Sequence, residues 1–203
     1  LDPIWQTAGE LGIPVMAHVA DPVAFFDPLD EYNERWEELE LHPEWSFADR
    51  SKYPALETLF EQVNNVYRTF TDVKFVAVHV AGYSENLRAV SSWLDQLPNL
   101  SIDTAARIGE LGKHDSREGH DFFTKYQDRI MFGTDLALWE EWEVQGAGPC
   151  KDFTTEENHQ FYDIHWRYFQ TNDKQFDHPT PIQGKWKIDG IGLDDEVLKK
   201  IYW

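Results

Sequence analysis

Three apolar runs of this sequence each end at a side chain that could do chemistry. The runs are residues 13–19 with His18, residues 73–80 with His79, and residues 130–132 followed by Asp135. An ionised carboxylate at the mouth of a buried strand is costly unless something cationic lies beside it. Imidazole and carboxylate are also the ligands that suit Zn²⁺ and similar divalent ions. We therefore predict that the three side chains converge on one site.

A fourth run, residues 100–104, carries Asp103 and is followed by Arg107. Arg107 suits bidentate pairing with a substrate carboxylate, and a surface arginine is the alternative. Asp103 has a plain reading, because Asp-Thr can simply initiate a turn. Each histidine could instead be a hydrogen-bonded structural residue, and Asp135 could instead cap a following turn.

The elements that must position these residues alternate along the chain. The patterns predict strands at residues 13–19, 73–80, 100–104 and 130–134, and helices at residues 2–11, 54–70, 85–97, 116–126, from 155 and from near 194. Ser84 is the predicted cap of the third helix. Alternation of this kind indicates parallel strands joined by right-handed crossovers. In such folds the active site lies where the strands end, which is where these side chains fall.

The fold class predicted is α/β of the (β/α)₈ TIM-barrel type, with about four strands present in one domain over residues 1–203. A four-stranded parallel sheet with helices on both faces is the alternative. Two long connections, residues 20–53 and 136–153, are rich in aromatic residues. Loops of this length are usually functional, and we expect these two to wall the pocket.

Composition sets outer limits on function. The chain of 203 residues is 41% hydrophobic and 15% aromatic, which is ample for a packed core. A net charge of −19 argues against a nucleic-acid partner and favours solubility, an acidic patch for a basic partner being the alternative. The single cysteine, Cys150, excludes an intrachain disulfide. No run approaches a membrane span, and no signal peptide is visible, so we expect a cytoplasmic protein without a membrane partner.

Four segments resemble the second half of the metal-dependent amidohydrolase superfamily, in the branch that contains aminocarboxymuconate-semialdehyde decarboxylase. They are Ile-Pro-Val-Met-Ala-His ending at His18, Val-Ala-Val-His ending at His79, Leu-Ser-Ile-Asp-Thr-Ala-Ala-Arg ending at Arg107, and Asp-Arg-Ile-Met-Phe-Gly-Thr-Asp ending at Asp135. The resemblance covers most of the chain, and its last segment is the most specific.

The resemblance implies a role for each residue. His18 would be a metal ligand on strand five of the barrel, and Asp135, on strand eight, would bind the metal and orient a water. His79, on strand six, would be a second ligand or the catalytic acid/base. Asp103 and Arg107 would contact substrate. The implied cofactor is a divalent metal, Zn²⁺ with Mn²⁺ as the alternative.

The family's first strand carries a His-x-His pair, and this sequence has none. We therefore expect a fragment that holds the second half of a barrel, with weak or absent metal. It would form a homo-oligomer or pair with the other half-barrel. The leading function is metal-dependent hydrolysis or non-oxidative decarboxylation of a small carboxylated or aromatic molecule. The alternatives are a catalytically incompetent half-barrel that only binds or assembles and, more remotely, a doubly wound domain for Mg²⁺-assisted phosphoryl chemistry.

Overall fold

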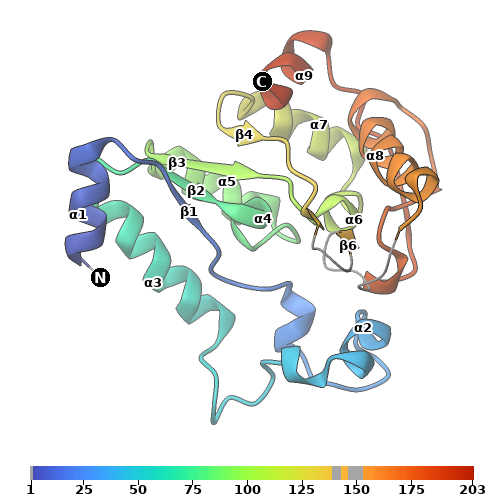
Figure 1. The fold of residues 1–203 in the computed structure, drawn as a ribbon, viewed down its shortest axis with the longest axis horizontal. Coiled ribbons are helices and arrows are strands. Elements are labelled where there is room, and N and C mark those ends of the chain that lie inside the picture. The colour runs from blue at the N-terminus through green and yellow to red at the C-terminus, as the bar shows by residue number, and fades with distance from the viewer. Residues whose placement is uncertain (1, 139–142, 146–152) are drawn as a thin grey trace.

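The computed structural model describes residues 2–138, 143–145 and 153–203. Within them, β1 (Val15–Ala17), β2 (Phe75–Ala77), β3 (Leu100–Asp103) and β4 (Ile130–Met131) form a sheet in the order β1-β2-β3-β4. Every neighbouring pair is parallel, which confirms the α/β prediction. Figure 1 shows this sheet in the middle of the molecule, with α1 (Asp2–Leu11) and α3 (Leu56–Thr69) on the β1 side.

The register divides the strand residues between two faces, because successive side chains point to opposite sides. Phe75, Leu100 and Ile130 are buried on one face, where they join a core with Tyr67 of α3. The other face carries Met16 and Val76, which are register partners, and Met131. Met16 is 69% exposed and Met131 is 41% exposed, so this second face is open to solvent.

The remaining long helices begin and end close to the predicted positions. They are α5 (Leu87–Gln96), α7 (Ser116–Lys125), α8 (Thr155–Gln170) and α9 (Asp195–Tyr202). A capping box begins α8, with Thr154 accepting from the Glu157 amide while the Glu157 carboxylate accepts from the Thr154 amide. The prediction for Ser84 was wrong, because Asn86 caps α5 by accepting from the Ala89 amide.

All four predicted strands are shorter in the structure, and the first two lose the most residues. The run at residues 13–19 contributes only Val15–Ala17, and this strand lies at the edge of the sheet rather than being buried on both faces. The run at residues 73–80 leaves the sheet at Ala77 and turns through α4 (Val78–Ala81). Apolar composition predicted a longer strand there, but it carries no information on where pairing stops.

The two long connections contain short elements. Residues 20–53 include η1 (Val23–Phe26), α2 (Trp36–Leu41) and η2 (Pro43–Trp45). After β4, β5 (Leu136–Leu138) pairs antiparallel with β6 (Glu143–Gln145), and the rest of the predicted loop at residues 136–153 lies mostly outside the described residues. Short α6 (Ile108–Leu111) follows β3, and β7 (Phe176–Asp177) pairs with β8 (Lys187–Ile188) around η3 (Pro181–Gln183). In the described part of the chain, no helix is both long and apolar enough to cross a membrane.

Candidate active site

The end of β2 holds His79 in an unusual backbone conformation. His79, Val80 and Ala81 have φ angles of 60°, 55° and 59°, and Gly82 follows at 70°. The left-handed region costs a residue with a Cβ atom about 1–2 kcal/mol, so three in succession must be held by their surroundings. Strain of this kind is concentrated at functional sites, which marks this turn as a candidate.

Two contacts hold His79 there. Its backbone N–H donates to Asp103 Oδ1 at 2.7 Å, and its ring Nδ1 lies 2.8 Å from the Ala105 carbonyl oxygen. The same Asp103 oxygen accepts from the Ala105 amide at 3.1 Å. The pKa of His79 is lowered to about 4. Burial is the largest cause, nearby Arg107 adds to it, and the contact with the Ala105 carbonyl opposes both. The ring is therefore neutral near pH 7.

His18 and Asp135 lie beside this histidine. The His18 and His79 rings meet edge to face, with their centroids 5.0 Å apart. Asp135 also has a positive φ, 60°, and is exposed at the strand end. Surrounding protein nevertheless desolvates its carboxylate enough to raise the pKa, against the opposing effects of Arg107 and His18.

Two cavities adjoin these residues. One, of about 250 Å³, is lined by Asp21, Pro22 and Arg107 and by the aromatic side chains of Phe25, Trp45 and Phe47, together with His18, His79 and Asp135. The other, of about 600 Å³, lies over the open face of the sheet and includes Met16, Asp103 and Met131. Among the described residues, His18, His79 and Asp135 line both cavities. The structure thus brings the three predicted residues together.

Arg107 is placed inside the molecule, so the surface reading of this residue was wrong. It is only 3% exposed, and its Nη1 donates to the Ala106 carbonyl at 2.9 Å. Burial lowers the pKa of its guanidinium, against the raising effect of Glu110. No carboxylate of the described residues lies within ion-pair distance of it, and it lines the smaller cavity. A buried cation at a cavity wall that forms no ion pair with the described residues is suited to an anionic ligand.

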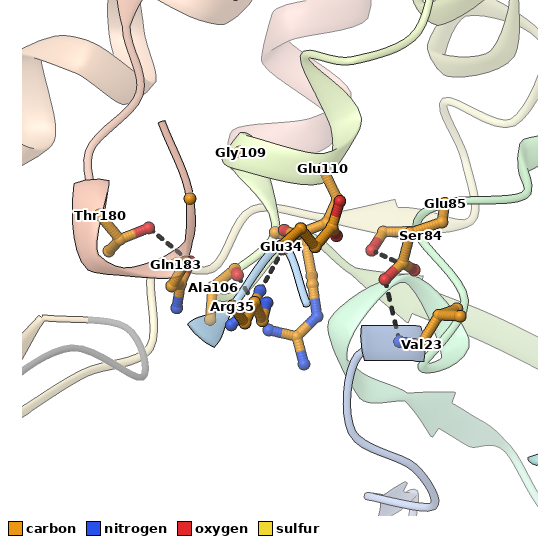
Figure 2. A network of polar contacts seen from close by, with 12 residues as sticks. Val23, Glu34, Arg35, Ser84, Glu85, Ala106, Gly109, Glu110, Thr180 and Gln183 are labelled. Atoms are coloured by element: carbon orange, nitrogen blue, oxygen red, sulfur yellow. Dashed lines mark hydrogen bonds and ion pairs between the residues drawn. The ribbon is translucent and has the colours of Figure 1, made fainter. Parts of the chain in front are cut away.

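A buried charge network lies directly behind this wall. Arg35, from the connection at residues 20–53, forms ion pairs with Glu38 and with Glu110 of α6, and all three side chains are almost fully buried. Figure 2 shows Arg35 meeting Glu110 and, nearby, Glu85 accepting from the Val23 amide and the Ser84 hydroxyl. These contacts join two points of the long connection, at Val23 and at Arg35, to the loops after β2 and β3.

The pKa shifts of the network agree with its geometry. Burial alone would raise the pKa of Glu110, but Arg35 and Arg107 lower it overall. Burial alone would lower the pKa of Arg35, but Glu110 and Glu38 raise it. Burial raises the pKa of Glu38 and of Glu85. The Arg35–Glu110 pair is therefore ionised, with Glu110 also lying in the field of Arg107.

The His, Asp and Glu side chains of the described residues do not match the expected metal site. Among the described residues, no three His, Cys, Asp or Glu side chains gather closely enough to hold an ion. Asp103 commits Oδ1 to two backbone amides, and His79 commits Nδ1 to a carbonyl. Cys150 lies outside the described residues. The residues present therefore do not make a complete metal site.

Sequence reasoning missed Arg35, Glu38, Glu85 and Glu110. The spacing of Arg35 and Glu38 fits a helical i,i+3 pair, a signal that was present but weak. Nothing local in the sequence connects either residue with Glu110. Of the cavity wall, Asp21 and Pro22 were also missed, although they follow a predicted strand end.

The fold and the site define an α/β protein with a cavity of charged and aromatic side chains at the carboxyl ends of parallel strands. A family model described as Amidohydrolase matches residues 1–203, and the chain belongs to this family. The resemblance to amidohydrolases seen in the sequence is thereby confirmed at the level of the family, while the decarboxylase branch and the assignment to the second half of a barrel stay predictions. The search of the curated proteins gave no match.

Among solved structures, the chain is similar to an uncharacterized TIM-barrel protein from Bordetella bronchiseptica, with 17% identity and a TM-score of 0.39. The match covers 66% of this chain and 36% of that one, so it spans little more than a third of the solved protein.

Proposed function

We propose that the chain carries part of the active site of a hydrolase or non-oxidative decarboxylase for a small carboxylated or aromatic molecule. The observation that carries the proposal is the sharing of His18, His79 and Asp135 by both cavities. A substrate seated in the smaller cavity would place its reacting atoms against these three side chains. Family membership supports hydrolysis as the general reaction class.

Arg107 and the aromatic wall would select the substrate. A carboxylate against the Arg107 guanidinium would supply the charge that this buried cation lacks. Phe25, Trp45 and Phe47 would then pack against an apolar or aromatic body, which a volume of about 250 Å³ limits to a small molecule. Asp21 and Asp135 line the same cavity and would repel an anionic group that lay against them instead of against Arg107.

His79 would move the proton. Its Nδ1 faces a carbonyl oxygen, which can only accept, so the neutral ring carries its proton on Nδ1 and a lone pair on Nε2. Such a ring can take a proton from an attacking water, or return one to a carbon atom after loss of CO₂. Asp135 would orient that water.

If a Zn²⁺ or Mn²⁺ ion takes part, His18 and Asp135 are the donors that the described residues offer to it. The remaining donors would come from further strands beside β1. The open face supports such pairing, because Met16 is exposed on an edge strand. We propose that this face meets either a second copy or the other half of a barrel.

Calorimetric titration with benzoate tests the anion site. We expect Arg107→Met to weaken benzoate binding by about 10- to 100-fold, the usual worth of a charge-assisted hydrogen bond. Arg68→Met removes the same charge from an exposed position on α3 and serves as the control. Equal affinity of wild type and Arg107→Met would refute the anion site.

Turnover assays with aromatic carboxylates and their amides, in the presence and absence of Zn²⁺ or Mn²⁺, test the reaction class. Release of ¹³CO₂ from carboxyl-labelled substrate identifies decarboxylation, and release of amine identifies hydrolysis. The incomplete donor set favours the alternative, a half-barrel that binds without turnover. Benzoate binding without turnover under all of these metal conditions would favour this alternative.

The assembly proposal has its own measurement. Sedimentation of the wild-type chain is expected to show a dimer or larger species at micromolar concentration. Met16→Lys places a charge on the open face and should give a monomer, whereas Tyr32→Lys, at a site that is 87% exposed away from the sheet, should not. A wild-type monomer throughout would argue against a second copy as the partner.

A further inference from the structure

We propose that Asp103 is a positioning residue that fixes the backbone and the ring tautomer of His79, rather than a substrate contact. This inference deepens the proposed function, since it assigns the origin of the lone pair on His79 Nε2. It rests on the hydrogen bonds around one carboxylate oxygen and on the left-handed turn that follows β2.

Asp103 Oδ1 accepts two backbone N–H groups that belong to different strand ends. One is the His79 amide at 2.7 Å, which lies at the start of the left-handed turn. The other is the Ala105 amide at 3.1 Å, two residues beyond Asp103 itself. A single oxygen thus ties the loop after β3 to the strained turn after β2.

The hydrogen bond from the Ala105 amide to Asp103 also determines which nitrogen of the His79 ring carries the proton. The Ala105 residue that donates to Asp103 presents its own carbonyl oxygen to His79 Nδ1 at 2.8 Å. Because a carbonyl has no proton to give, this contact requires the proton on Nδ1. Holding Ala105 therefore holds the acceptor that selects the tautomer, and the lone pair remains on Nε2.

Burial fits a positioning role. Asp103 is only 7% exposed, while Asp135, at the end of the neighbouring strand, is exposed. The sheet register pairs Asp103 with Met131, so its side chain starts from the open face and folds back onto the backbone. A contact with substrate would have to use the second carboxylate oxygen, Oδ2. Asp103→Asn replaces that oxygen with an amide nitrogen and keeps Oδ1, so the two roles predict different results.

The test compares Asp103→Asn with Asp103→Ala in ¹⁵N-labelled protein. Long-range ¹H–¹⁵N correlation spectra report which ring nitrogen carries the proton, and His79→Gln assigns the signals. Asparagine keeps an oxygen acceptor for both amides but loses the charge. We expect the Nδ1–H tautomer in wild type and in Asp103→Asn, and a mixture of tautomers in Asp103→Ala. Ser101→Ala, on the same strand and face, is the matched control and should leave the His79 signals unchanged.

Two results would overturn the inference. An Asp103→Ala spectrum identical to wild type would show that the carboxylate does not set the tautomer. A shift of the proton to Nε2 in Asp103→Asn would show that charge matters and acceptor geometry does not. If Asp103→Ala fails to fold, hydrogen exchange of the His79 amide in wild type decides: slow exchange supports its bond to Asp103, and fast exchange overturns the inference.

These spectra need no turnover, so they separate this inference from the proposed function. Where an active preparation is available, Asp103→Asn is expected to keep kcat within about threefold of wild type. Asp103→Ala should lower kcat by about 100-fold with KM little changed, the usual loss of an acid/base group. A rise in KM alone, equal in both variants, would assign Asp103 to substrate contact instead. A tautomer change without any turnover in wild type would sink the proposed function and leave the positioning role intact.

Discussion

The Arg35 side chain forms a buried ion pair with the Glu110 carboxylate, across 75 residues of sequence. Neither side chain is exposed to solvent, and Glu38 shares the same guanidinium. The pair fastens the connection at residues 20–53 to α6, next to Arg107. The aromatic wall of the cavity is carried by that same connection, so the pair holds the wall in place.

Breaking this pair should be costly. We expect Arg35→Met to lower the free energy of unfolding by about 3–5 kcal/mol, because it leaves Glu110 and Glu38 buried without a cation. Urea denaturation followed by tryptophan fluorescence measures this. Glu34→Gln is the matched control, since the Glu34–Lys113 pair joins the same two segments but is partly exposed, and should cost less than about 1 kcal/mol. Equal losses in the two variants would contradict the assignment.

His165 should make the fold sensitive to acid. This residue of α8 is 1% exposed, its Nδ1–H donates to the Phe161 carbonyl at 2.7 Å, and burial lowers its pKa from 6.5 to about 4. Between those two pH values the unfolded chain binds a proton that the folded chain does not. The free energy of unfolding therefore falls as the pH drops from 6.5 to 4, by about 3 kcal/mol from this residue.

His165→Phe removes that titration and should flatten the pH dependence of stability between 6.5 and 4, measured by urea denaturation at several pH values. His159→Phe, exposed on the same helix, controls for the loss of a histidine. An unchanged slope in His165→Phe would mean that other groups cause the acid sensitivity.

The aromatic wall should contribute to ligand affinity. Trp45 stacks on His42 with ring centroids 4.0 Å apart and faces the smaller cavity. We expect Trp45→Ala to weaken benzoate binding by about 1 kcal/mol, roughly fivefold, through loss of ring contact. Calorimetric titration measures the change, and Tyr32→Ala, which lies exposed in the same connection, should bind like wild type. Stronger loss in Tyr32→Ala than in Trp45→Ala would place the ligand elsewhere.

Zinc should not remain bound at one ion per chain. His18 and Asp135 offer two donors, and the described residues bring no third one close enough. Elemental analysis after dialysis is expected to find far less than one zinc per chain, because two protein ligands hold Zn²⁺ weakly. Stoichiometric zinc that is lost in His18→Ala would show that the prediction is wrong.

The sequence by itself determined the alternation of strands and helices and the placement of His18, His79, Asp103 and Asp135 at strand ends. It could do so because burial imposes a local period on apolar residues, and parallel strands place their carboxyl ends at one edge. Local pattern did not reveal that the strand at residues 73–80 would stop at Ala77. That end point depends on the left-handed turn, which is held by Asp103 from the neighbouring strand.

Only the tertiary structure decided that Arg107 is buried and that Arg35 and Glu110 meet behind it. Charged residues read as surface residues in a sequence, because an isolated charge is too costly to bury. What makes the burial of Arg35 possible is a partner of opposite charge at the right place, and that partner, Glu110, lies 75 residues away. The path of the chain, rather than any local pattern, brings the two together.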